Sequence, residues 1–119
     1  MKKLTKTEEE IMHIIWHLNR CTVSDVIQQL GSPKPPHSTI SSIVRILEKK
    51  GFVDHKAYGR TYEYFPIISK ENYGKTNLQQ LVSNYFEGSM DRLVSYIVEE
   101  EKVDMEVIKK ILDDIPDEE

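Results

Sequence analysis

Apolar residues recur at helical spacing in three segments of the first half of the chain. Positions separated by three, four and seven residues fall on one side of a helix, so each segment predicts a helix with one buried face. The three sets are Ile11, Ile14, Ile15 and Leu18; Val26, Ile27 and Leu30; and Ile40, Ile43, Val44 and Leu47. Gly31 and the proline-rich run at 32–36 separate the second set from the third. The predicted order of helix, short helix, turn and helix is that of a helix-turn-helix unit.

Capping motifs indicate where the first helix begins. Thr7 and Glu10 have the spacing of a capping box, in which the two side chains satisfy backbone amides at the helix start. This spacing predicts a helix that begins after Thr7, although Thr5 with Glu8 is a competing start. Trp16 lies on the same helix, and its bulk predicts a place in the core against the third helix or the strands that follow it.

The second and third helices have start signals of their own. Thr22 or Ser24 is the expected cap of the second helix, because a hydroxyl there can accept a bond from a first-turn amide. Ser38 and Thr39 are the candidate caps of the third helix, and Gly51 marks its end.

Residues 52–65 change from helical spacing to a period of two. Tyr62 and Tyr64 alternate with polar neighbours, as expected for a strand with one buried face. Gly59 lies in a Tyr-Gly-Arg turn, where its tolerance of positive φ suits a tight hairpin. Three helices followed by a hairpin predict a winged helix-turn-helix domain over residues 1–68, mainly α with a small β-hairpin wing.

Residues 69–119 show helical spacing again and no strand pattern. The apolar stripes are Leu78, Leu81, Val82, Tyr85 and Phe86; Leu93, Val94, Ile97 and Val98; and Val107, Ile108, Ile111, Leu112 and Ile115. Three amphipathic helices within about fifty residues are too few to bury all of this surface on themselves. We therefore expect a helical dimerisation domain, in which two copies interlock as a homodimer.

The polar face of the third predicted helix carries hydroxyls and long cations. Hydroxyls bind base edges and phosphates, and cations bind phosphates and guanines, so this face suits the major groove of DNA. The candidate DNA-binding residues are Ser38, Thr39, Ser41, Ser42, Arg45, Lys49 and Lys50 on the helix, with Lys56 and Arg60 near the wing tip. A run of charges on a helix is often only a solvated face. Here it lies on the third helix of the right order and beside a wing, which favours double-stranded DNA as the partner.

Charge is distributed unevenly along the chain. The formal net charge is −4, but residues 1–68 carry +3 and residues 69–119 carry −7. Such asymmetry is more informative than the total. The basic half is suited to phosphate, and the acidic half to water or another protein.

Several classes of function are not expected. Cys21 is the only cysteine, so no intramolecular disulfide or cysteine-based metal cluster can form. His13 and His17 are four residues apart on one helix but have no evident third ligand, so we expect neither a metal nor a cofactor. No catalytic triad, P-loop or other enzyme motif is found, which predicts a protein that is not an enzyme. No apolar run could span a membrane and no signal peptide is evident, so the cytoplasm is the expected location.

The motifs taken in order resemble the BlaI/MecI family of penicillinase and methicillin-resistance repressors. They are Leu4-Thr5-x-x-Glu8, Ile11-Met12-x-x-x-Trp16, Val23-Ser24-Asp25-Val26, Thr39-Ile40 through Leu47-x-Lys49-Lys50-Gly51, and the Tyr62/Tyr64 strand. The resemblance implies a dimeric winged-helix repressor on palindromic operators. It also implies release by proteolysis in the C-terminal domain, triggered by a membrane-bound zinc metallopeptidase sensor.

The chain departs from this family at two positions. The family's cleaved bond is usually Asn-Phe, and Tyr96-Ile97 occupies the matching place here. The family often has an arginine where this chain has Ile46, whereas Arg45 lies one position earlier, so the operator sequence cannot be transferred. The cysteine cluster of the copper-responsive branch is also absent, and copper sensing is not expected.

Two other functions are compatible with the same pattern. Winged helices also serve as protein-interaction modules, and the acidic half could bind a basic partner. A ligand-gated regulator, with its effector bound between the two halves, is the third possibility.

Overall fold

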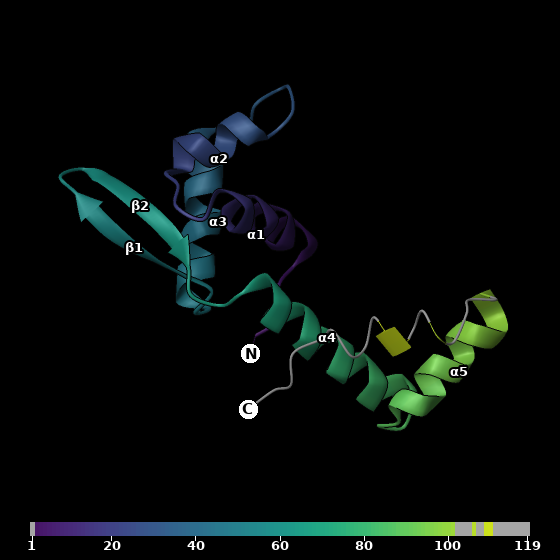
Figure 1. The fold of residues 1–119 in the computed structure, drawn as a ribbon. Helices are drawn as coiled ribbons and strands as arrows, with labels where there is room; N and C mark the ends of the chain where they lie inside the picture. The colour runs from purple at the N-terminus through teal and green to yellow at the C-terminus, as the bar shows by residue number, and fades with distance from the viewer. Residues whose placement is uncertain (1, 102–105, 107–108, 111–119) are drawn as a thin grey trace. The chain divides into compact units, whose positions relative to one another are not determined.

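The computed structural model describes residues 2–101, 106, 109 and 110 (Figure 1). The chain divides into two compact units, Met1–Lys70 and Glu71–Glu119. Within the described residues, the first unit contains three helices and a two-stranded antiparallel sheet, in the order that the hydrophobic pattern predicts. Two further helices, α4 and α5, follow them.

Helix α1 comprises Lys6–Leu18. It begins at the Thr5–Glu8 capping box rather than at the expected Thr7–Glu10 box. The Thr5 hydroxyl accepts from the Glu8 amide at 3.2 Å, and the Thr5 amide donates to the Glu8 carboxylate at 2.9 Å. The start predicted at Thr7 is therefore wrong, and the competing start is correct. The physical reason is a tertiary contact, because the Glu8 carboxylate is buried and also forms an ion pair with Lys50. A capping box at Thr7 would not provide this contact.

Helix α2 comprises Val23–Gln29, and its cap is Thr22. The Thr22 hydroxyl accepts from the Asp25 amide at 3.1 Å, while the Asp25 carboxylate accepts from the Thr22 amide at 2.9 Å. Of the two candidate caps, Ser24 is instead an exposed residue within the helix.

Helix α3 comprises His37–Lys49 and has Pro36 at its cap position, without any side-chain cap bond. The Pro36 carbonyl accepts the first backbone bonds of the helix. Ser38 and Thr39 therefore lie inside the first turn, and neither is the cap that the sequence suggested. Proline suits this place because its φ is already close to the required value and the cap position needs no amide hydrogen.

The wing is a hairpin of β1, Val53–Tyr58, and β2, Thr61–Pro66. Tyr58 pairs with Thr61, so Gly59 and Arg60 form a two-residue turn. Gly59 has a φ of +64°, which confirms the glycine-dependent turn. One further pairing was not predicted, since Cys21 and Tyr64 exchange backbone hydrogen bonds of 3.0 and 2.7 Å. This bridge fixes the hairpin against the segment between α1 and α2.

The core of the first unit combines all three helices with the base of the hairpin. Its buried apolar side chains are Leu4, Ile11, Met12, Ile15, Cys21, Val23, Val26, Ile40, Val44, Leu47, Phe52, Val53 and Tyr64. Trp16 is half-buried, and its indole nitrogen donates to the carbonyl of Ile68 at 2.8 Å. The tryptophan thus binds the segment just after β2.

The second unit contains α5, Met90–Glu101, and, except for its first residue, α4, Lys70–Tyr85. Glu87 and Gly88 have positive φ values of 52° and 75° and separate the two helices. Its buried apolar residues, within the part that the structure describes, are Tyr73, Val82, Leu93 and Val94. The third predicted stripe, Val107, Ile108, Ile111, Leu112 and Ile115, lies outside the described residues. Among the described residues, no helix has the length and hydropathy needed to span a membrane.

Candidate nucleic-acid interface

The face of α3 opposite the core carries most of the predicted DNA-binding residues. Ile40, Val44 and Leu47 turn one side of the helix inward, which leaves the polar side outside. The exposed members on α3 are Ser38, Thr39, Ser42, Arg45 and Lys49, and Ser41 is half-buried. Within the helix, the Ser42 hydroxyl donates to the Ser38 carbonyl at 2.9 Å, so its lone pairs remain able to accept from a ligand.

A groove of about 590 Å³ lies between α2, α3 and the turn of the hairpin. It is lined by Thr22, Val23 and Ser24, by His37, Ser41 and Arg45, and by Gly59, Arg60, Thr61, Tyr62 and Tyr64. The groove brings together Ser41, Arg45 and Arg60 from the predicted set. None of its lining residues is acidic, so the two guanidinium groups give it a positive potential suited to phosphate.

The start of α2 and the aromatic residues of β2 also line this groove, and sequence reasoning did not assign them. Thr22 and Ser24 were considered only as helix caps, and Tyr62 and Tyr64 only as strand residues. The helix-turn-helix order could have indicated that the start of α2 lies at the interface. In such a unit the helix that precedes the recognition helix, here α2, crosses the DNA backbone beside it.

Two titratable groups at the junction with the hairpin remain uncharged at neutral pH. Burial raises the pKa of the Cys21 thiol to about 11, and the nearby carboxylates of Asp25 and Glu63 add to this shift. Burial, followed by the charge of Glu48, raises the pKa of the Tyr64 hydroxyl above its ordinary value. Tyr64, which lines the groove, therefore adds no negative charge to its wall.

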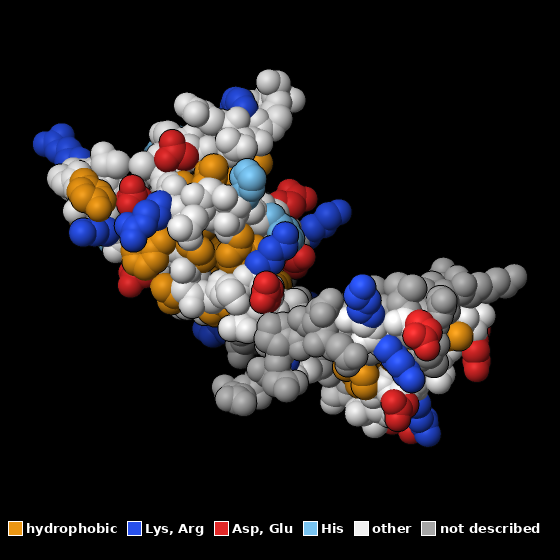
Figure 2. All heavy atoms as spheres, viewed as in Figure 1, with side chains coloured by type: hydrophobic (Ala, Val, Ile, Leu, Met, Phe, Trp, Pro, Cys, Tyr) orange, Lys and Arg blue, Asp and Glu red, His pale blue; other side chains and the backbone are white. Residues whose placement is uncertain are grey.

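Lys56 and Arg60 lie on the wing, where Figure 2 shows Lys and Arg side chains at the turn end of the hairpin. Both residues are exposed. The Lys56 amino group lies 5.6 Å from the centre of the Tyr58 ring, which orients the cation without burying it. Both cations are thus accessible to the sugar-phosphate backbone of a nucleic acid beside the wing.

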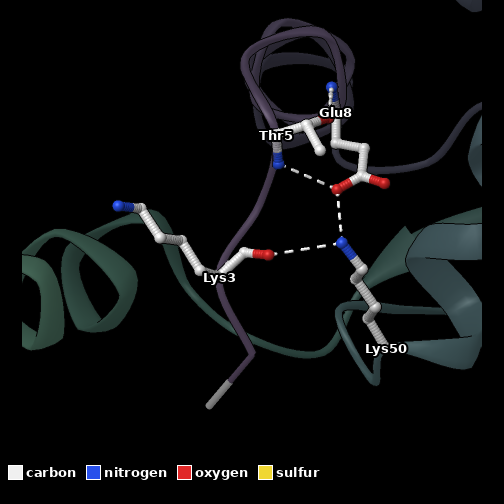
Figure 3. Close-up of polar contacts among 4 residues, drawn as sticks. All are labelled: Lys3, Thr5, Glu8 and Lys50. Carbon is white, nitrogen blue, oxygen red and sulfur yellow. Dashed lines mark hydrogen bonds and ion pairs between the residues drawn. The ribbon is translucent and has the colours of Figure 1, made fainter.

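Lys50 differs from the other predicted cations because it is engaged inside the domain. Its amino group donates to the Glu8 carboxylate at 2.6 Å and to the Lys3 carbonyl at 3.2 Å (Figure 3). The two charged side chains are only 21% and 9% exposed. Lys50 therefore connects the start of α1 to the end of α3, and we do not include it in the DNA-binding surface.

The same contact determines the ionisation of Glu8. Burial by itself raises the pKa of this carboxyl group, but the ion pair with Lys50 and the bonds from Thr5 outweigh burial. The pKa of Glu8 is consequently lower than its ordinary value, and the carboxylate is ionised at neutral pH.

His55 connects the wing to α3. Its Nδ1 atom lies 2.5 Å from a carboxylate oxygen of Glu48, and its ring stacks on Tyr62 with centroids 4.3 Å apart. This histidine is therefore a half-buried bridge between two elements. By contrast, His13 is paired with Glu9 at 3.8 Å on the outside of α1.

Comparisons with known proteins agree with this arrangement. The penicillinase repressor family model matches residues 4–116. The methicillin resistance regulatory protein MecI of Staphylococcus aureus (strain N315) is 23% identical over 110 residues, which cover 92% of this chain and 89% of that protein. The penicillinase repressor of Bacillus licheniformis is 27% identical over 119 residues, covering 93% and 90%.

A solved structure resembles the first part of the chain. It is the solution structure of the DNA-binding domain of the repressor BlaI, with 31% identity and a TM-score of 0.52. The match covers 61% of this chain and 94% of that domain. The fold class predicted from the sequence, a winged helix followed by helices, is confirmed.

Proposed function

Because the chain belongs to the penicillinase repressor family, we propose that it represses transcription by binding duplex DNA as a homodimer. The observation that carries the proposal is the groove between α3 and the wing. It presents Arg45 and Arg60 from two elements with no acidic residue in its lining. The relatives of this chain are named for regulation and repression, in line with the expectation of a non-enzymatic function.

The proposed binding mode places α3 in the major groove. A groove about 12 Å wide accepts one helix, and the exposed side of α3 carries the hydroxyls of Ser38, Thr39 and Ser42 and the cations Arg45 and Lys49, with Ile46 exposed among them. Arg45 is the residue best suited to a bidentate contact with guanine, because its guanidinium is long, exposed and fork-shaped. Arg60 and Lys56 would bind the adjacent sugar-phosphate backbone from the wing.

Dimerisation is proposed to occur through the second unit. Leu81, Tyr85 and Tyr96 are 42%, 75% and 51% exposed, and a second copy that covered them would remove this apolar surface from water. Within the predicted dimerisation set, Val82, Leu93 and Val94 are buried in a single chain. We assign these three to the chain's own packing rather than to the interface.

Release from DNA is proposed to follow proteolysis at the Tyr96–Ile97 bond by a membrane-bound metallopeptidase sensor. Both residues lie within α5, with Tyr96 exposed and Ile97 half-buried. Since a protease needs an extended segment, α5 would have to unwind locally before cleavage. Cleavage of this bond would detach the residues after Tyr96 from the proposed dimer surface.

The proposal is tested by incubating the purified protein with fragments of genomic DNA at physiological salt and sequencing those it retains. A dimer with two recognition helices should enrich one inverted repeat, with half-sites separated by about one helical turn or a small multiple. Salt-sensitive binding without an enriched sequence would contradict the operator-binding proposal. That outcome would favour a winged helix that acts as a protein-interaction module.

A further inference from the structure

Three potential metal ligands meet where α3 joins the wing. Glu48 lies in the last turn of α3, and Asp54 and His55 are near the start of β1. One ligand atom from each of the three side chains lies within 4.8 Å of the other two. Among the residues that the structure describes, these three form the group of histidine and carboxylate side chains that are close enough together to share one metal ion.

Two features hold these side chains in place. The His55 ring is stacked on Tyr62 at an interplanar angle of 15°, which restricts rotation of the imidazole, while its Nδ1 atom faces the Glu48 carboxylate. The Asp54 carboxylate accepts a hydrogen bond from the backbone amide of His55 at 2.7 Å, and this bond limits rotation of the Asp54 side chain. Glu48 and His55 have side chains only 29% exposed, so the cluster lies partly within the domain surface.

We propose that Glu48, Asp54 and His55 form a binding site for a divalent transition-metal ion. One imidazole and two carboxylates are a donor set that such ions accept, with water completing the coordination. Ligands around a tetrahedral ion of this kind lie roughly 3.4 Å apart, so binding would require small side-chain rotations that move the His55 Nδ1 atom and the Glu48 carboxylate oxygen apart from their 2.5 Å contact. The bound ion would fix the wing to the end of α3.

The site also has a consequence for DNA, which rests on the proposed function. The Glu48 carboxylate adds negative charge one helical turn away from Arg45 on α3, and the Asp54 carboxylate adds a second charge at the start of β1. A divalent ion neutralises this charge, so the Glu48 and Asp54 carboxylates then no longer compete with phosphate for Arg45. We infer that metal binding strengthens DNA binding.

The site is tested first without DNA, by titrating the full chain with Co²⁺ and recording its visible absorption bands. We expect one Co²⁺ per chain, and loss of at least about tenfold in affinity for His55→Gln and for Asp54→Asn, because even groups outside the first coordination sphere contribute that much. His13→Gln is the matched control, since His13 also pairs with a glutamate but lies on α1. Circular dichroism establishes that each variant is folded.

Either of two results would overturn the site: no saturable Co²⁺ binding, or binding that His55→Gln and Asp54→Asn leave unchanged. The second measurement compares DNA affinity with and without Co²⁺ at constant ionic strength. A gain of at least about fivefold in the unmodified chain, absent in His55→Gln, is the expected result. An equal affinity would overturn the effect on DNA. Because the Co²⁺ titration uses no DNA, failure of the metal site is distinguishable from failure of the repressor proposal.

Discussion

The two units of this protein differ in how completely each buries its apolar residues. The largest fully buried side chains in the described part of the chain, Phe52 and Met12 foremost, all belong to the first unit. In the second unit the most buried apolar residues retain between 4% and 9% of their surface, and Tyr85 is 75% exposed. The fully enclosed side chains are therefore in the first unit, although both units also expose large apolar residues, such as Ile67 at 56% in the first unit.

The difference extends to polar contacts. In the first unit, α1 and α2 both begin with complete capping boxes, and a partly buried ion pair connects the start of α1 to the end of α3. In the second unit, the ion pair between Arg92 and Glu87 is exposed, with 62% and 74% of each side chain accessible. Exposed pairs of this kind contribute little to stability. The Arg92–Glu87 pair should therefore add little to the stability of the second unit.

Replacing a core residue of the first unit should produce the largest effect. Phe52→Ala removes a fully buried ring and should lower the free energy of unfolding by about 3–5 kcal/mol, through lost burial and the cavity left behind. The measurement is urea unfolding followed by the fluorescence of Trp16, the only tryptophan, which reports the first unit.

Leu81→Ala is the matched variant in the second unit, because Leu81 is a large apolar residue that is 42% exposed. It should change the Trp16 transition by less than about 0.5 kcal/mol. Equal losses from Phe52→Ala and Leu81→Ala would show that the two units do not differ in the way their burial indicates.

Arg45→Ala should have the next largest effect, on DNA rather than on folding. Loss of a bidentate base contact costs about 1–3 kcal/mol and relaxes the preference at the contacted position. Affinity for the selected operator and for single-base variants of it is measured by fluorescence anisotropy. Arg92→Ala is the control, because Arg92 is an exposed arginine of the second unit. If both variants bind with unchanged affinity and specificity, α3 does not lie in the major groove.

Local signals in the sequence were sufficient for the elements of the first unit. The spacing of Ile40, Val44 and Leu47 predicted α3 and its exposed polar face, and Gly59 predicted the hairpin turn. These predictions succeed because helical periodicity and turn geometry depend on residues close in the chain.

Contacts between distant residues were not predicted. Lys50 has the same sequence context as a DNA-binding cation, and only the fold brings it to Glu8, 42 positions earlier. That contact also explains why α1 begins at the Thr5 capping box. The meeting of Glu48 with His55 depends on how α3 turns into β1, which spacing alone does not specify. Sequence periodicity identifies faces and turns, but it does not identify which polar side chains pair across the core.

Tyr85→Ala should weaken self-association about tenfold, which corresponds to about 1.4 kcal/mol for one aromatic side chain at an interface. Sedimentation velocity over a range of concentrations measures the effect. Tyr58→Ala is a matched control because Tyr58 is an exposed tyrosine, 52% accessible, in the first unit. A dimer that weakens equally in both variants, or in neither, would place the interface somewhere other than this part of α4.

Glu8→Gln should have the smallest effect, about 1 kcal/mol at neutral pH, because glutamine preserves the capping box but not the ion pair with Lys50. The pKa of Glu8 is lower in the folded chain than in the unfolded chain. Its ionised form therefore stabilises the fold fully above the ordinary glutamate pKa, and this stabilisation is lost as the pH falls through the lowered pKa. The difference between the original chain and Glu8→Gln should shrink over that acidic range in urea unfolding.

Glu10→Gln on the same helix is the control, because Glu10 is exposed and was the partner in the capping box predicted at Thr7. It should leave stability unchanged to within about 0.5 kcal/mol at every pH, as surface substitutions commonly do. If Glu10→Gln costs as much as Glu8→Gln, or if the Glu8→Gln difference does not depend on pH, the ion pair does not stabilise the first unit. The contrast in internal polar contacts between the two units would then lose its main support.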